Sequence, residues 1–288
     1  IPDRIKKELD KKNIVIVTGF QGVNRYNDMT TLGRGGSDTS AVAIASVMKA
    51  DLCQIYTDVE GVFTADPRKV KDARKLDHIS YDEMLELATL GAQVLNNRSV
   101  EMAKKYGIRL EVLSSLTKKR GTIVKEATNV EKMLISGIAK DEDVARVSII
   151  GVPDRPGLAF KIFSKLSAKN INVDIILQSV GRNGTKDISF TVSQANLKET
   201  IDILDPYVEL IGATSVVYDE NVAKVSIVGA GMETHPGTAA EMFEALYDAN
   251  INIQMIATSE IKISVLIDRS DADKAVTTIH NKFFNDAM

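Results

Sequence analysis

The stretch VARVSIIG at residues 144–151 decides the fold of the second half of the chain, because it returns as VAKVSIVG at residues 222–229. Two further motifs return with it: RPG (155–157) as HPG (235–237), and NINVDI (170–175) as NINIQM (250–255). Each copy predicts a strand, a helix, two strands and a helix, which is a ferredoxin-like βαββαβ unit still lacking its final strand. The sequence therefore predicts two such modules in tandem.

The final strand of each module has to be found outside these motifs. The first copy ends with GATSVVYDE, which can close its own sheet, whereas the second ends at Met288 directly after a predicted helix. The counterpart of the closing strand is MLISGIAKD at residues 133–141, because GIAKDEDV and SVVYDENV lead into the two copies without a gap. We therefore expect a first module at 145–221 and a second that combines 133–141 with 222–288.

The first 125 residues alternate between strand, loop and helix patterns, which predicts an α/β sandwich with a largely parallel sheet. A loop is expected after IVIVTG, and Ser80 and Glu83 form a plausible capping box. The predicted strands are IVIVTG (14–19), LCQIYTD (52–58) and IRLEVLS (108–114), and the predicted helices are 41–50, 80–89 and 94–106, with a further helical pattern at the start of the chain.

The composition is that of a globular protein of about two domains, with 288 residues, 44% hydrophobic and 26% charged. A net charge of −3 and a pI near 5.8 leave no overall basic field for nucleic acid or anionic lipid. The apolar run 41–48 is too short to span a bilayer, and no signal-peptide pattern is present. The single cysteine, Cys53, is expected to be a buried thiol rather than a reactive one, and a reducing cytoplasm fits.

The run TTLGRGGSDTSA at residues 30–41 lies between a predicted strand and a predicted helix, where parallel-sheet proteins bind ligands. Its glycines let the backbone approach a ligand, Arg34 can form a bidentate pair with an anion, and a helix start near Ser37 offers free N–H groups. The alternative is a structural turn. It is not a Walker A loop, because no lysine follows the glycines.

The stretch IYTDVEGVFTADPR (55–68) contains the end of the strand 52–58 and a second polar loop that follows it. Asp58 could bind Mg²⁺ or a ribose hydroxyl, or could simply form an Asx turn. Asp66, Pro67 and Arg68 could form a turn with an exposed arginine. Two polar loops at the carboxyl ends of neighbouring strands together favour a ligand site.

Several motifs together resemble the aspartokinase family: VTGFQGVN, TTLGRGGSDTSA, YTDVEGVFTADPR, SYDEMLELATLGAQVL, NRSVE and the two modules with PG and NIN. The resemblance covers essentially the whole chain. It implies a partial amino-acid kinase fold, with a mostly parallel sheet in an α/β/α arrangement, followed by two ferredoxin-like ACT domains. It also implies transfer of phosphate from ATP, with Mg²⁺, to the β-carboxylate of L-aspartate. This is the first step toward lysine, threonine and methionine, and the resemblance is to the monofunctional, feedback-inhibited type.

The resemblance assigns roles to single residues of the two loops. The aspartate substrate would be held by Arg34, Gly35, Gly36 and Ser37. Asp38 matches the acidic residue that orients groups around the transferred phosphoryl, and is the catalytic candidate. The nucleotide would contact Thr57, Asp58, Phe63, Thr64, Ala65, Asp66, Pro67, Arg68 and Gln93. No residue is assigned as a ligand of a resident metal.

The chain departs from the family pattern in two places. The K-F-G-G segment, whose lysine holds the phosphates, is absent from the sequence, and Gln93 stands where some members have a lysine that contacts nucleotide. We therefore expect this chain alone to have little kinase activity.

The ACT resemblance implies amino-acid effector sites, at the loop after the first strand of a module and against the second strand of a partner module. In the first module the matching residues are Asp154, Arg155, Pro156, Gly157, Asn172, Val173, Asp174 and Gln178. In the second module they are Thr238, Ala239, Asn252, Ile253, Ser259 and Glu260, next to His235, Pro236 and Gly237. Each Pro-Gly alone could be a plain turn; the repeated Asn-Ile-Asn favours a site. His235 is expected to be a loop residue, and His78 and His280 are expected to be solvated.

The implied effectors are lysine, threonine or both, and pairing of ACT modules implies a homo-oligomer. The competing hypothesis is a non-catalytic regulatory chain that binds amino acids. In the family such shorter subunits start at an internal Met, for which Met133 is suitably placed, and one could also be a partner here. Another amino-acid kinase, such as a glutamate kinase, would leave the ACT pair unexplained.

Overall fold

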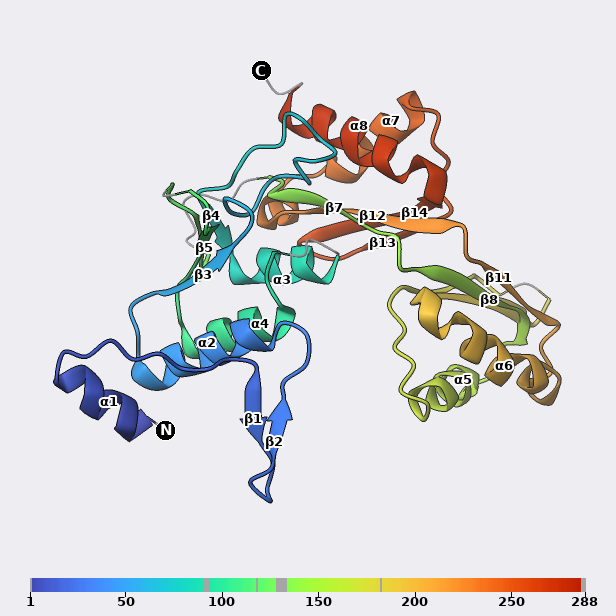
Figure 1. The fold of residues 1–288 in the computed structure, drawn as a ribbon. Coiled ribbons are helices and arrows are strands. Elements are labelled where there is room, and N and C mark those ends of the chain that lie inside the picture. Colours follow the sequence, from blue (N-terminus) through green and yellow to red (C-terminus); the bar gives the residue numbers. More distant parts are fainter. Residues whose placement is uncertain (1, 91–93, 118, 128–133, 182, 286–288) are drawn as a thin grey trace.

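The computed structural model of the protein describes residues 2–90, 94–117, 119–127, 134–181 and 183–285. An N-terminal lobe is followed by two modules of helices on sheets (Figure 1). The helices of the lobe are α1 (Pro2–Asp10), α2 (Gly36–Met48), α3 (Tyr81–Thr89) and α4 (Asn97–Tyr106). Its strands are β1 (Gln21–Val23), β2 (Met29–Thr31), β3 (Cys53–Thr57), β4 (His78–Ser80), β5 (Leu110–Ser114) and β6 (Thr122–Lys125).

The main sheet of the lobe has the order β3-β5-β6-β4. β3 pairs with β5, and β4 with β6, in parallel, whereas β5 and β6 are antiparallel. The chain turns back before β6 at Gly121, where a Cβ would lie 2.0 Å from the Val112 carbonyl oxygen, so a side chain cannot fit. The mostly parallel sheet was predicted, but the short strands β4 and β6 were not.

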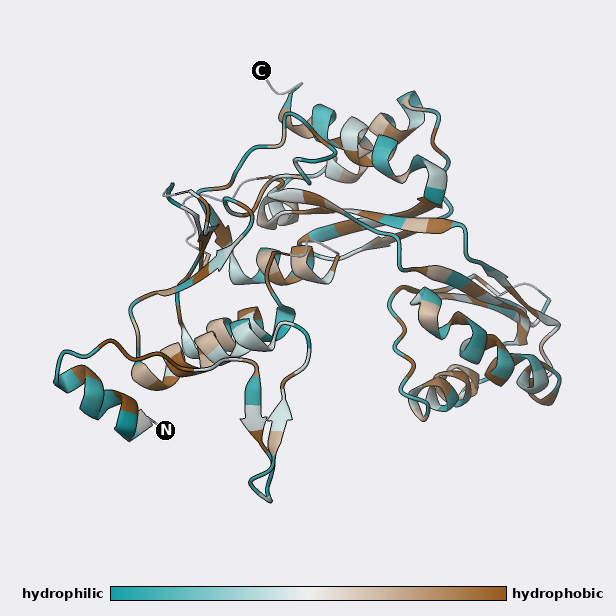
Figure 2. Cartoon of the chain, viewed as in Figure 1, coloured by the Kyte–Doolittle hydropathy of each residue, from teal (hydrophilic) through white to brown (hydrophobic). Residues whose placement is uncertain are grey.

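The predicted strand at 14–19 is wrong. Residues 14–19 have no regular structure, and the side chains of Ile14 and Ile16 are 93% and 92% exposed. Figure 2 shows this stretch as hydrophobic coil between α1 and β1. A strand needs a neighbour for its backbone hydrogen bonds, and among the described residues none lies beside it. The loop predicted after it contains the β1–β2 hairpin instead.

Other local predictions are confirmed or shifted. The capping box is present, because Ser80 accepts from the Glu83 N–H and Glu83 accepts from the Ser80 N–H. The helix predicted from residue 94 begins at Asn97, because the Asn96 side chain accepts the Arg98 N–H at 3.0 Å and caps it. Cys53 is a buried thiol, as predicted.

The two modules have the predicted order of elements. The first contains β8 (Ala145–Pro153), α5 (Leu158–Ser167), β9 (Ile176–Gln178), β10 (Thr185–Val192), α6 (Gln194–Ile211) and β11 (Ser215–Asp219). The second contains β7 (Gly137–Asp141), β12 (Val222–Val228), η1 (Ala230–Thr234), α7 (Thr238–Asp248), β13 (Met255–Thr258), β14 (Lys262–Asp268), η2 (Arg269–Asp271) and α8 (Ala272–Phe284).

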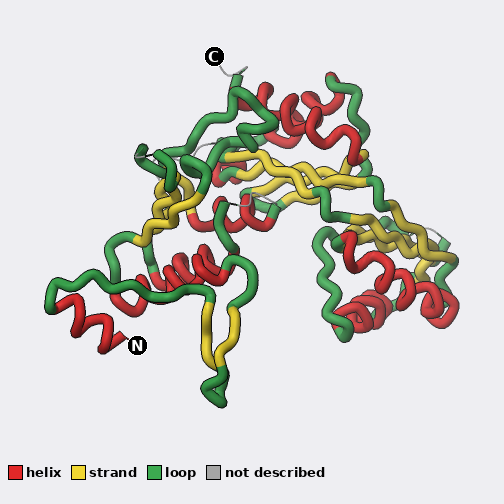
Figure 3. The backbone as a smooth tube through the Cα atoms, in the orientation of Figure 1, coloured by secondary structure: helices red, strands yellow, loops and turns green. Residues whose placement is uncertain are grey.

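The strands that close the two sheets are those that the alignment of the two internal copies predicts. β11 pairs with β8 in the sheet β11-β8-β10-β9, and β7 pairs with β12 in the sheet β13-β14-β12-β7. Figure 1 shows β7 beside β12, although the whole first module separates them in sequence. The helices of the two modules lie on opposite sides of the strands in Figure 3.

The N-terminal lobe and the second module share their hydrophobic cores. Ala65 and Val70 of the lobe are buried in the core of the second module. Ala139 of β7 and Val228 of β12 are buried in the core of the lobe. These two parts therefore pack as neighbours, with α3 against β7 and β12.

Candidate functional site: a glycine-rich turn at the start of α2

The glycine-rich turn enters α2 through a left-handed backbone. Gly33 has a φ of 82° and Gly35, the residue that caps α2, a φ of 73°, values that side chains tolerate poorly. The turn closes through a hydrogen bond from the Gly36 N–H to the Gly33 carbonyl at 3.0 Å. The first N–H groups of α2 thus follow a bare backbone, an arrangement that favours binding of an anion.

Asn96 brings the start of α4 against this turn. Its side-chain amide donates to the Arg34 carbonyl at 3.2 Å, while its carbonyl oxygen caps α4. A Cβ at Gly35 would lie only 2.3 Å from the Asn96 amide nitrogen, so the close contact requires glycine. Sequence reasoning did not select Asn96; its position directly before NRSVE, as an N-cap, was the available signal.

Asp38 and Arg34 supply opposite charges around the turn. Asp38 is half-buried, and burial raises its pKa, against hydrogen bonds from the Asn96 backbone and the Ser37 side chain that lower it. Burial, and then the Asp38 charge, raise the pKa of the Cys53 thiol. Arg34 is exposed and forms no ion pair with the described residues. Its guanidinium is therefore available to an anion at the turn.

Thr57 and Asp58 lie at the carboxyl end of β3, beside the end of β5. The Ser115 N–H donates to the Thr57 carbonyl at 2.8 Å, and the Thr57 hydroxyl donates to Asp58 at 3.1 Å. Further along the loop, Arg68 forms a bidentate pair with Asp66, whose Oδ2 lies 2.9 Å from an Arg68 nitrogen. The Arg68 side chain holds the pKa of Asp66 below its ordinary value.

Not all of the predicted nucleotide residues face solvent. Thr64 and Ala65 are buried, and their side chains lie against the second module. Phe63 is half-buried and Pro67 is exposed. Gln93 lies outside the described residues.

Thr64 contacts the second module through His280. The Thr64 hydroxyl lies 2.8 Å from His280 Nε2. The expectation that His280 is solvated is wrong, because α8 turns it inward and its ring stacks on Phe284 at 4.6 Å. Burial lowers the pKa of His280, and the charge of Arg74 lowers it further. His78 is exposed, as expected.

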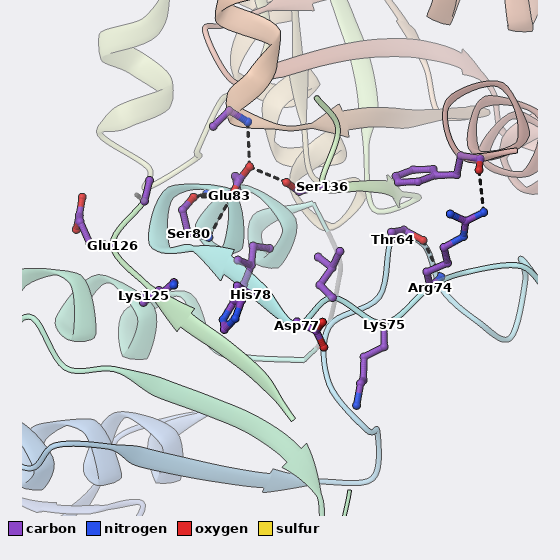
Figure 4. Close-up of a pocket in the computed structure, with 15 residues that line it drawn as sticks. Thr64, Arg74, Lys75, Asp77, His78, Ser80, Glu83, Lys125, Glu126 and Ser136 are labelled. Carbon is purple, nitrogen blue, oxygen red and sulfur yellow. Dashed lines mark hydrogen bonds between the residues drawn. The ribbon is translucent and has the colours of Figure 1, made fainter. Parts of the chain in front are cut away.

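Glu83 forms the second connection between the lobe and the second module. Its buried carboxylate accepts hydrogen bonds from the Ser136 hydroxyl at 2.6 Å and the Ala230 N–H at 2.9 Å, in addition to Ser80 (Figure 4). Burial by itself would raise the pKa of Glu83, but these hydrogen bonds outweigh it and hold the pKa below the ordinary value. The same groups line a cavity of about 340 Å³ between the two parts, together with Arg74 and Lys125.

The predicted effector residues of the first module gather at two places. Asp154, Arg155 and Pro156 are exposed in the loop after β8, and Gly157, with a φ of 88°, caps α5. Asn172 and Asp174 are exposed in the segment before β9, Val173 is half-buried, and Gln178 ends β9. Asp154 pairs with Lys186 at 2.8 Å, whereas Asp174 pairs with Lys224 of the second module.

The second module repeats this layout with a longer loop. Gly237, with a φ of 106°, caps α7, and Thr238 is buried with its hydroxyl on the His235 carbonyl at 3.1 Å. Ala239 and Ile253 are half-buried, and Asn252, Ser259 and Glu260 are exposed. His235 is an exposed loop residue, as expected. The second strands of both modules, β9 and β13, are edge strands of their sheets.

Comparison with known proteins identifies these parts. The amino acid kinase family matches residues 1–114, and the ACT domain matches residues 146–207 and 225–283. The aspartokinase of Helicobacter pylori is 52% identical over 282 residues, which cover 96% of this chain and 69% of that protein. The chain belongs to the aspartokinase family. It spans about 69% of the length of this curated relative.

Solved structures of aspartokinases have the same fold. The aspartate kinase of Clostridium acetobutylicum aligns with a TM-score of 0.87 at 30% identity, over 98% of this chain and 66% of that one. E. coli aspartokinase III, solved with aspartate and ADP in an R-state, aligns with a TM-score of 0.78 at 28% identity, over 95% of this chain and 61% of that one. Its T-state structure with lysine and aspartate gives 0.76 at 28% identity, over 98% and 64%.

The described residues contain neither a membrane-spanning helix nor a metal-binding cluster. None of their helices is long and apolar enough to cross a membrane. Within the same residues, no group of three His, Cys, Asp or Glu side chains is arranged to hold a metal ion.

Proposed function

We propose that this chain carries the aspartate- and nucleotide-binding parts of an aspartokinase together with its feedback-regulatory half. The reaction transfers the γ-phosphoryl of ATP to the β-carboxylate of L-aspartate. The observation that carries the proposal is the turn at residues 33–36, held by Asn96 between the starts of α2 and α4. Two helix N-termini and one exposed guanidinium at this turn suit the two carboxylates of aspartate.

Each residue of the turn has a definite task in this proposal. Arg34 pairs with a substrate carboxylate, and the N–H groups of Gly35 and Ser37 flank it, while the Gly36 N–H closes the turn on Gly33. Asp38 orients groups near the transferred phosphoryl. Because aspartate is already ionised at pH 7, the protein needs no activated nucleophile. Its work is to align the carboxylate with the γ-phosphoryl and to balance charge.

The nucleotide is assigned to the second loop. Thr57, Asp58 and residues 63–68 are assigned to it, although Thr64 and Ala65 are buried and the Thr64 N–H and carbonyl are hydrogen-bonded to Arg74 and Ile138. Mg²⁺ would arrive with ATP and neutralise phosphate charge, and Asp58, exposed at the end of β3, is the carboxylate suited to meet it. Gln93 is assigned here from sequence alone.

The regulatory half is proposed to bind lysine, threonine or both. The domain division follows the strand pairing: 1–125 for the kinase part, 145–221 for the first ACT module, and 133–141 with 222–288 for the second. The edge strands β9 and β13 leave backbone groups that a second copy can pair with, which supports a homo-oligomer.

Calorimetric titration with lysine, threonine, L-aspartate and ATP·Mg²⁺ tests the proposal. We expect binding of at least one amino acid at the ACT modules and binding of ATP at the lobe. Arg34→Ala is expected to lower affinity for aspartate while leaving effector affinity unchanged. Effector binding without ATP or aspartate binding would favour a non-catalytic regulatory chain instead.

A further inference from the structure

The ammonium group of Lys224 lies where three segments of the chain meet. Lys224 is on β12 and only 5% exposed. Its Nζ donates to Asp174 Oδ2 of the first module, and lies 3.5 Å from Asp141 Oδ2 at the end of β7. A side chain of the second module therefore holds a predicted effector residue of the first.

The cluster of Lys224, Asp141 and Asp174 has a net negative charge, which favours binding of a second cation. A buried ammonium is costly unless carboxylates pair with it, so Lys224 has to keep at least one of its two partners. One cation and two carboxylates carry one surplus negative charge. The Asp174 side chain is 52% exposed, so the amino group of a bound amino acid can reach it, whereas Lys224 itself is inaccessible.

β7 connects this cluster to the N-terminal lobe. Asp141 ends β7, directly opposite Lys224 in the strand register. At the other end, Ser136 donates to Glu83 of α3, and the Ile138 N–H donates to the Thr64 carbonyl at 2.8 Å. The five-residue strand β7 thus connects the Lys224 cluster to two parts of the lobe, helix α3 and the loop that contains Thr64.

We propose that Lys224 couples occupation of the first module's amino-acid site to the N-terminal lobe. An effector ammonium that engages Asp174 weakens the hold of Asp174 on Lys224. Asp141 is then the remaining carboxylate partner of the buried ammonium, and a stronger pair with it shifts the end of β7. At the other end of this strand, Ser136 and Ile138 are hydrogen-bonded to Glu83 and Thr64. This inference rests on the proposed function, in which Asp174 belongs to an effector site, and it makes Lys224 a positioning residue.

The internal repeat supplies a matched control. Arg146 is the counterpart of Lys224, and it lies 3.5 Å from Asp219 of the closing strand β11. The counterpart of Asp174, however, is Gln254, which is uncharged. The second copy therefore lacks the carboxylate that a cation could take from Arg146, and the coupling is expected to work in one direction only.

Hydrogen–deuterium exchange of the whole chain, with and without lysine or threonine at concentrations that calorimetry shows to be saturating, tests this inference. In the wild type we expect a severalfold change in exchange of residues 134–141 on effector binding. Lys224→Met should bind effector but lose this change, whereas Arg146→Met should keep it. Asp174→Asn, without effector, should resemble the effector-bound wild type over 134–141.

The possible failures are distinct. Wild-type chain that binds neither amino acid would overturn the proposed function and this inference together. Wild-type chain that binds effector with unchanged exchange at 134–141 would overturn the coupling alone. The same holds if Lys224→Met keeps the change, if Arg146→Met also loses it, or if Asp174→Asn behaves like the free wild type. Loss of effector binding in Lys224→Met would make Lys224 a part of the site rather than the link, and would also overturn it.

Discussion

Replacing Glu83 by alanine removes the carboxylate that joins α3 to the second ACT module. Glu83 is 6% exposed and accepts hydrogen bonds from Ser80, Ser136 and Ala230. Two of these donors belong to the second module, and the Ser136 side chain is itself buried. The substitution therefore leaves two donors of the second module without acceptors, and also removes the acceptor of the Ser80 N–H in the capping box, whereas Ser80 still caps α3.

The magnitude follows from these parts. Loss of the hydrogen bond from the Ser80 N–H to Glu83 in the capping box costs about 1 kcal/mol. The two donors of the second module, left unsatisfied, cost about 1–3 kcal/mol each, with the half-buried Ala230 N–H at the lower end. The sum is about 3–5 kcal/mol, which corresponds to a fall in melting temperature of roughly 6–20 °C for a unit of this size.

Urea unfolding followed by far-UV circular dichroism measures this cost, since the chain has no tryptophan to report it. The matched control is Glu86→Ala, one turn further along α3, which loses a partly exposed pair with Lys262 at 2.8 Å. Such a pair contributes about 0–1 kcal/mol. A loss of less than about 1 kcal/mol in Glu83→Ala, or an equal loss in Glu86→Ala, would show that the Glu83 carboxylate does not stabilise this contact.

The pH dependence of Glu83 gives an independent check. Its pKa in the folded protein lies below the ordinary value of 4.5, so its contribution to stability is complete above that value. The contribution is lost as the pH falls through the lower folded pKa. Glu83→Gln should therefore be less stable than wild type at pH 7, and this difference should shrink toward pH 3.

Three further outcomes are expected. Gly35→Ala should weaken aspartate binding more than tenfold in calorimetry and Gly33→Ala less, since both have positive φ but only the Cβ at 35 meets the Asn96 amide; equal losses would contradict the close contact. Residues 222–288 alone should unfold at lower urea concentration than 133–288, because β12 loses its five-residue pairing with β7; equal midpoints would contradict the shared sheet. Asp38→Asn should raise the melting temperature at pH 7, because the raised pKa of Asp38 means that its ionised form costs stability there, and the gain should vanish below about pH 3.8; a fall at pH 7 would contradict it.

The sequence predicted the modules well because an internal repeat carries more information than local propensity. Aligning two copies located the missing strand of the second sheet, a contact that no local pattern could show. The N-terminal lobe was harder. Residues 14–19 have the composition of a buried strand, but pairing depends on a neighbour that composition cannot supply.

The candidate site likewise has one part that the sequence predicts and one part that it does not. The glycine turn could be located from its residues and a helix start, whereas Asn96, sixty residues later, could not be assigned to it without the tertiary contact. His280 was misjudged because a histidine near the end of a helix is ordinarily solvated. Its burial depends on Thr64, which is distant in sequence.

The shared cores provide a route by which regulation would reach the proposed nucleotide loop. Ala65 and Val70, within and just after that loop, are buried in the core of the second module, while Ala139 and Val228 of the module are buried in the core of the lobe. Close-packed cores shift between discrete arrangements instead of deforming smoothly, so the second module cannot move far without moving this loop. The position of the second module should therefore affect the proposed nucleotide site directly, through contacts of the same chain. A signal from the first module then needs to reach only β7 and Lys224, and the remaining path is the packing of the lobe itself.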